Sequence, residues 1–135
     1  ITDNGLKSAD ARDVIRKFQI DQIAKLATHL KAVPEGNGTM LDNTMIIYLS
    51  DTGEAHHSRR KEWPFIIVGG RGHKMKTAGR YLRYPKYGQS GHKTIGNYYN
   101  TILQASGSPI RDHFGQLDNK LKDLDLRGPL SELTL

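Results

Sequence analysis

The spacing of apolar residues along this chain predicts a long amphipathic helix over residues 10–33. Asp10 and Asp13 lie near the start of this stretch and Lys31 near its end, where the helix dipole favours those charges. Pro34 and Gly36 stop the helix, and the composition of PEGNG, residues 34–38, predicts a turn. The apolar positions recur close to the helical period: Val14, Phe18, Ile23, Leu26, Leu30 and Val33.

Two short, unbroken apolar runs predict buried strands. They are TMIIYL, residues 44–49, and FIIV, residues 65–68, and GGRG at 69–72 ends the second. Apolar residues on both faces are typical of strands in a parallel sheet that is covered by helices. RYLRY, residues 80–84, alternates and predicts an edge strand or an extended arm. Residues 93–105 predict a second helix, although Gly96 disfavours it by about 1 kcal/mol relative to Ala.

The order of these elements predicts an α/β fold with a mostly parallel sheet. The length of 135 residues suits a single domain over 1–135, with residues 1–9 loose and 116–135 a tail. Two strands are few for such a sheet. We therefore expect either the C-terminal part of a larger α/β domain, truncated or processed before Ile1, or a homo-oligomer that completes the sheet. No apolar run approaches the roughly 20 residues that cross a bilayer, so no membrane span is expected.

The net charge of +6 is concentrated in one segment. Residues 59–93 contain ten Lys or Arg residues and a single acid, Glu62. Such a segment attracts phosphate esters, sulfate esters or nucleic acid, the alternative being a solvated basic face without a partner. Tyr81, Tyr84 and Tyr87 are interleaved with the bases and could stack on nucleobases. No known nucleic-acid module is matched, and nucleic acid is not the expected partner.

Candidate metal ligands follow the first predicted strand in SDTGEAHH, residues 50–57. Ligands gather beyond the carboxyl ends of strands in open α/β sheets, and Asp51 lies two residues past Leu49. The chain has no Cys, so His and carboxylate ligands would have to hold Zn, Mn, Mg or Ca. A solvated polar loop is the alternative. The candidates within the stretch are Asp51, Glu54, His56 and His57.

His92 is a further candidate ligand, because it opens the second predicted helix and a helix N-terminus favours the neutral, metal-binding imidazole. Its alternative is a helix-start residue without a ligand. Organic cofactors are not expected. GGRGHK has Met75 where the third glycine of a dinucleotide fingerprint belongs, and no Gly-Lys-Ser/Thr follows to complete a P-loop. No serine lies in a nucleophile elbow.

The order and spacing of several motifs resemble the C-terminal part of an uncharacterised family of exported bacterial proteins, itself related to the alkaline phosphatase and sulfatase superfamily. The resemblance covers roughly residues 14–115. It rests on KAVPEGNGTMLDNT, IIYLSDTGE, the histidine-rich loop, WPFIIVGGRG, GRYLRYP and HKTIGNYYNTILQASG. It implies a three-layer α/β/α sandwich, an exported or periplasmic location, and a metal site that hydrolyses phosphate or sulfate esters.

By position, Asp51 resembles the superfamily's strand-end metal ligand, His92 its late histidine, and His56 or His57 its loop histidines. Two positions depart from the pattern of the superfamily: Thr52 stands where many relatives have His or Asn near the aspartate, and Glu62 where they have His before Trp-Pro. Glu could still ligate Mg or Ca. The superfamily's nucleophile lies in an N-terminal half that this chain does not cover.

The sequence therefore predicts the C-terminal portion of a metal-dependent ester hydrolase, inactive alone. Its substrate would be an anionic ester in the parent protein, attracted by the bases around the second strand's end. The alternative is a non-enzymatic module that docks a polyanion or protein partner on residues 59–93. The expected anion-binding residues are Arg71, Lys74, Lys76 and Arg80.

Overall fold

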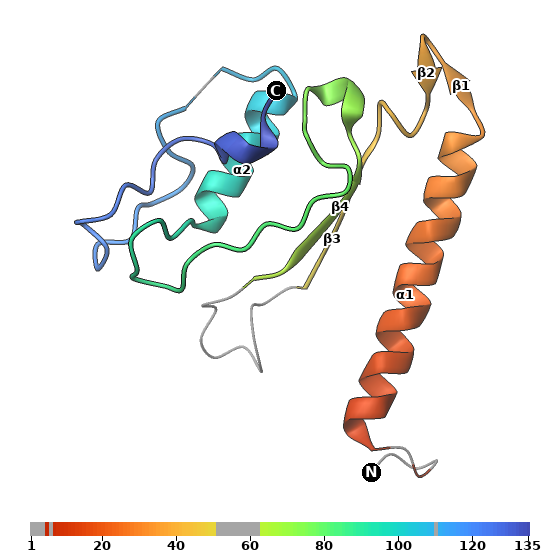
Figure 1. Ribbon diagram of the computed structural model, residues 1–135, viewed down its shortest axis with the longest axis horizontal. Coiled ribbons are helices and arrows are strands. Elements are labelled where there is room, and N and C mark those ends of the chain that lie inside the picture. Colours follow the sequence, from red (N-terminus) through yellow and green to blue (C-terminus); the bar gives the residue numbers. More distant parts are fainter. Residues whose placement is uncertain (1–4, 6, 51–62, 110) are drawn as a thin grey trace. The chain divides into compact units, whose positions relative to one another are not determined.

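The computed structural model describes residues 5, 7–50, 63–109 and 111–135. The chain divides into two compact units, Ile1–Leu41 and Asp42–Leu135, which are described separately (Figure 1). Within the described residues, no helix is long and apolar enough to cross a membrane.

The first unit consists of helix α1, Ser8–Lys31, and a small hairpin. The predicted helix is confirmed, with Asp10 in its first turn and His29 and Lys31 in its last. The predicted turn is confirmed too: strands β1, Pro34–Glu35, and β2, Gly38–Thr39, pair antiparallel across it. The apolar stripe of α1 lies largely in solvent, since Val14 is 61% exposed and Phe18 63%.

The sheet of the second unit contradicts the predicted topology. Strands β3, Met45–Leu49, and β4, Phe65–Gly69, form where the apolar runs predicted them, but they pair antiparallel, with Ile47 opposite Ile67. Both sheets in the described part of the chain are two-stranded. The three-layer α/β/α sandwich with a mostly parallel sheet was therefore wrong. The unit is a small mixed α/β structure.

The apolar runs predicted a parallel sheet wrongly because one face of the β3–β4 pair covers a core and the other does not. Residues on the inner face, among them Ile47 and Phe65, pack against the core of the unit. On the other face Ile66 is 45% exposed. An unbroken apolar run therefore reflects one partly buried face that packs on the core and one face that is more open to solvent, instead of two helix-covered faces.

Helix α2, Ile95–Ala105, packs against the inner face of this sheet, and the predicted second helix is confirmed. It begins with a capping box: the Thr94 hydroxyl accepts from the backbone N–H of Asn97, and the Asn97 side chain accepts from the backbone N–H of Thr94. The ring of Tyr98 lies 4.3 Å from the ring of Phe65, centroid to centroid. This stacking fixes α2 on the sheet.

The C-terminal segment, expected to be a tail, contributes to the core of the unit. Leu130 and Leu133 join Met75 and Tyr98 in one buried cluster, and Leu121 and Leu126 are buried as well. A short 3-10 helix, Ser131–Leu133, lies in this segment. The spaced leucines of residues 121–133 are thus core positions.

Candidate functional site

The basic residues that follow β4 lie on a loop whose backbone is firmly held. Gly70 turns the chain in the left-handed region with φ 77°, and its N–H donates to the Thr44 carbonyl at 2.8 Å. A 3-10 helix, Arg71–His73, follows. A Cβ on Gly72 would lie 2.5 Å from Oδ1 of Asn43, so a larger residue there would require the Asn43 side chain to move.

The C-terminal segment fixes the next part of the loop. The N–H of Lys76 donates to the Leu133 carbonyl, and the N–H of Leu135 donates to the Lys74 carbonyl, each at 3.0 Å. Met75, between the two lysines, is only 3% exposed and forms an antiparallel bridge with Thr134. Both lysine side chains are therefore exposed on a backbone that is anchored by a buried residue.

Arg80 is the fourth predicted anion-binding residue, and it too contacts the C-terminal segment. Its guanidinium Nη1 donates to the backbone carbonyl of Glu132, while the side chain stays exposed. All four predicted residues, Arg71, Lys74, Lys76 and Arg80, are thus exposed on one loop of the second unit. Lys74 is the only described residue other than glycine with a positive φ, at 59°, a conformation that costs a side-chain-bearing residue energy.

His92 is buried, with 8% of its surface exposed, three residues before α2. Its Nδ1 lies 3.3 Å from the carbonyl oxygen of Pro85. A carbonyl oxygen can only accept, so this contact needs the hydrogen on Nδ1 and leaves Nε2 as the nitrogen that could bind a metal. The ring of Tyr87 packs against the imidazole edge to face, 5.5 Å between centroids.

A second pair of side chains lies beside His92. The Tyr87 hydroxyl donates to Oδ2 of Asp118 at 2.6 Å, and the backbone N–H of Lys120 donates to Oδ1 at 2.9 Å. The bond from Tyr87 is the main reason that the pKa of Asp118 is lowered, and it raises the pKa of Tyr87. The positive charge that His92 can carry lowers the pKa of Asp118 further.

The predicted metal ligands Asp51, Glu54, His56 and His57 lie outside the described residues. His92 is described, but among the residues that the structure places, no three His, Asp or Glu side chains form a group that could hold a metal ion. Of the five predicted ligands, the described residues include only His92. A divalent Zn, Mn, Mg or Ca ion at this site stays a prediction.

Sequence reasoning missed the acidic residues that contact this region. Asp118 accepts a hydrogen bond from Tyr87, which lies 31 residues earlier in the sequence. The Glu132 carbonyl accepts one from Arg80, which lies 52 residues earlier. The Glu132 charge adds to burial in raising the pKa of Tyr84, which reaches about 12. No local pattern marks such contacts. The spaced leucines of the C-terminal segment are the signal from which its packing onto the unit could have been predicted.

Comparison of the chain with models of protein families, with curated proteins and with solved structures finds no match.

Proposed function

We propose that the second unit recognises the anionic group of a phosphate or sulfate ester, as the C-terminal portion of a metal-dependent ester hydrolase. The observation that carries this proposal is the charge of residues 63–109, which include no Asp or Glu. Seven bases fall in that stretch: Arg71, Lys74, Lys76, Arg80, Arg83, Lys86 and Lys93. Bases in such excess concentrate ligands of the opposite sign, and the acids that contact this stretch, Asp118 and Glu132, do so at Tyr87 and Tyr84.

Anchoring of the loop supports the proposal. The hydrogen bonds of Lys74 and Lys76 with the C-terminal segment hold the backbone, so less entropy is lost when an anion orders their side chains. The left-handed backbone of Lys74 is a strained conformation retained at an exposed position. Strain of this kind is found at binding sites more often than elsewhere.

A charged and a neutral phosphate ester, compared under the same conditions, test anion recognition. We expect the full chain to bind phenyl phosphate, a dianion, and to show no saturable binding of triethyl phosphate, which is neutral. Calorimetry at low salt measures both. Equal binding of the two compounds would overturn the proposal, because charge would then not govern recognition.

The proposed metal site depends on His92. Metal-binding histidines usually donate their second ring N–H to a carbonyl or carboxylate, which is the role that Pro85 fills here. In the parent protein a bound metal would polarise the ester and stabilise negative charge on its oxygens. Asp51, Glu54, His56 and His57 are the proposed additional ligands.

Uptake of Zn²⁺ and Mn²⁺ by the full chain tests the proposed metal site. We expect the double variant Asp51→Ala, His92→Ala to bind at least tenfold less metal than the wild type. His113→Ala is the matched control, because His113 is an exposed histidine that already contacts an acid, Asp112. Equal uptake by the wild type and the double variant would remove the metal assignment.

A non-enzymatic module that docks a polyanion on residues 59–93 is the second candidate function. The same run of bases favours it, since its length exceeds what one small ester can contact. The two functions respond differently to solution conditions. Polyanion binding weakens steeply with salt as counterions are released, whereas a metal site responds to a chelator.

A further inference from the structure

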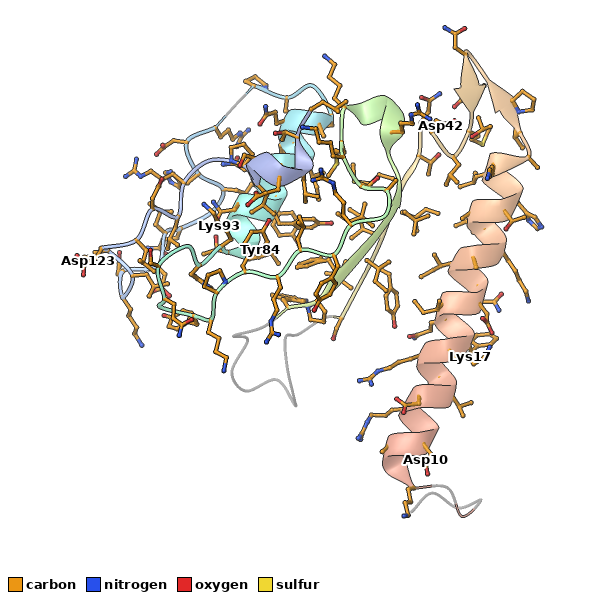
Figure 2. All side chains as sticks on the ribbon, in the orientation of Figure 1. Asp10, Lys17, Asp42, Tyr84, Lys93 and Asp123 are labelled. Carbon is orange, nitrogen blue, oxygen red and sulfur yellow. The ribbon has the colours of Figure 1, made fainter. Side chains whose placement is uncertain are left out.

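Residues 80–86, the extended segment, cross the surface of the second unit without a turn or bend (Figure 1). Two contacts fix the segment on one side. Arg80 donates to the Glu132 carbonyl, and Tyr84, labelled in Figure 2, packs against the core cluster. Side chains alternate along an extended chain, so Tyr81 and Arg83 point away from those contacts. Both are exposed, Tyr81 to 88%.

The backbone of this segment is open. Among the described residues, no strand pairs with it, and no backbone–backbone hydrogen bond reaches the N–H or C=O groups of residues 80–84. Extended backbone with unpaired groups is a template for the addition of another strand. It is also held in place, so the loss of chain entropy on pairing falls mainly on the incoming strand.

We propose that the extended segment binds an acidic peptide, which adds to it as a strand. Backbone hydrogen bonds to residues 80–84 hold the peptide, and its carboxylates pair with Arg83 and Lys86. Charge complementarity selects such a partner, because the 47 residues from 63 to 109 contain no acid. Glu132 contacts the segment at Arg80 and Tyr84, on the side opposite to Tyr81 and Arg83. The exposed ring of Tyr81 covers an apolar or aliphatic part of the peptide.

The open backbone distinguishes a peptide from other polyanions. A single-stranded nucleic acid could pair with the bases and stack on Tyr81, but it has no N–H and C=O ladder to complete. The proposal does not depend on hydrolysis or on a metal. It also differs from ester recognition, which uses the loop at Arg71, Lys74 and Lys76. Arg80 belongs to both regions, but its guanidinium faces the Glu132 carbonyl and pairs with no carboxylate of the peptide.

A peptide of about nine residues with alternating Glu and Thr is the probe, measured by fluorescence anisotropy with the full chain. The control is the same peptide with N-methyl groups on alternate backbone amides on the pairing edge, which keeps every charge but removes the pairing hydrogens. We expect the control to bind at least tenfold more weakly, since several hydrogen bonds are lost. Equal affinities for the two peptides would overturn the proposal, because they would leave charge alone as the cause of binding.

Variants and a competing ligand locate the site. Arg83→Gln should weaken binding of the unmodified peptide by about threefold to tenfold. Lys122→Gln removes an equally exposed base outside the segment and should leave the affinity within about twofold. Equal effects of the two substitutions would contradict the location. An oligothymidylate of the same net charge that binds more tightly than the peptide would assign the segment to nucleic acid instead.

Discussion

Nδ2 of Asn97 lies 2.9 Å from the carbonyl oxygen of Arg127. The same amide group also donates to the carbonyls of Leu126 at 3.1 Å and Gly128 at 2.9 Å. Asn97 is 1% exposed, and its Oδ1 accepts from the N–H of Thr94. One side chain thus joins the start of α2 to the C-terminal segment, which in turn holds the loop with Lys74 and Lys76.

Removal of this amide should destabilise the second unit strongly. We expect Asn97→Ala to cost about 3 kcal/mol, because it leaves buried carbonyls and an N–H without partners. Asn100→Ala is the matched control: its Nδ2 donates to one carbonyl, of Arg111 at 3.1 Å, so about 1 kcal/mol is expected. Urea unfolding measures the free energy of unfolding of both variants. A smaller loss for Asn97→Ala than for Asn100→Ala would contradict the role of Asn97.

Tyr98 should limit stability at high pH. Burial, with a smaller contribution from Tyr99, raises the pKa of Tyr98 from its ordinary 10.0 to about 12. Between these two values the unfolded chain loses this proton while the folded chain keeps it. The stabilisation is therefore complete below pH 10 and falls by roughly 2–3 kcal/mol as the pH rises to about 12.

Tyr98→Phe tests this dependence. The Tyr98 hydroxyl is buried without a hydrogen-bond partner, so Phe should be at least as stable at pH 7. It should also lose less stability than the wild type between pH 10 and 12. Tyr81→Phe is the control, since that ring is exposed and should change neither quantity. An unchanged alkaline loss in Tyr98→Phe would contradict the assignment.

Gly96→Ala should destabilise the protein although it raises helix propensity. In an ordinary helix interior the change would contribute about 1 kcal/mol. Here a Cβ on Gly96 would lie 2.9 Å from the backbone oxygen of Phe114, which cannot move aside as a flexible side chain would. We expect a lower melting temperature than the wild type. A higher one would show that the segment at Phe114 does not approach α2 this closely.

Local patterns in the sequence were sufficient to predict where elements form. The turn at 34–38, the strand positions and both helices follow from short-range signals such as Pro34, Gly36 and the apolar runs. The relative direction of β3 and β4 does not follow from these signals, because an apolar run has the same composition in a parallel pair and in an antiparallel pair. Asn97 could not be assigned to the core either, since its partners lie 29 to 31 residues further along the chain.

At the candidate site, too, the sequence shows the local pattern but not the contacts that hold it. Clustering of bases is visible in the sequence, and all four predicted anion-binding residues are exposed on one loop. The anchors of that loop, Leu133 and Leu135, belong to a segment that was expected to be a tail. Their role depends on a bridge between Met75 and Thr134, which are 59 residues apart by number and share no motif.

Residue-resolved NMR of the full chain, titrated with inorganic phosphate at low salt, tests the central claim of anion recognition most directly. We predict saturable shifts of the backbone amides of residues 71–80, reduced at least about threefold in affinity by Lys74→Gln, Lys76→Gln. The matched double variant Lys120→Gln, Lys122→Gln removes the same charge from an acid-balanced segment and should bind as the wild type does. Shifts that do not saturate, or equal losses in the two double variants, would contradict the claim.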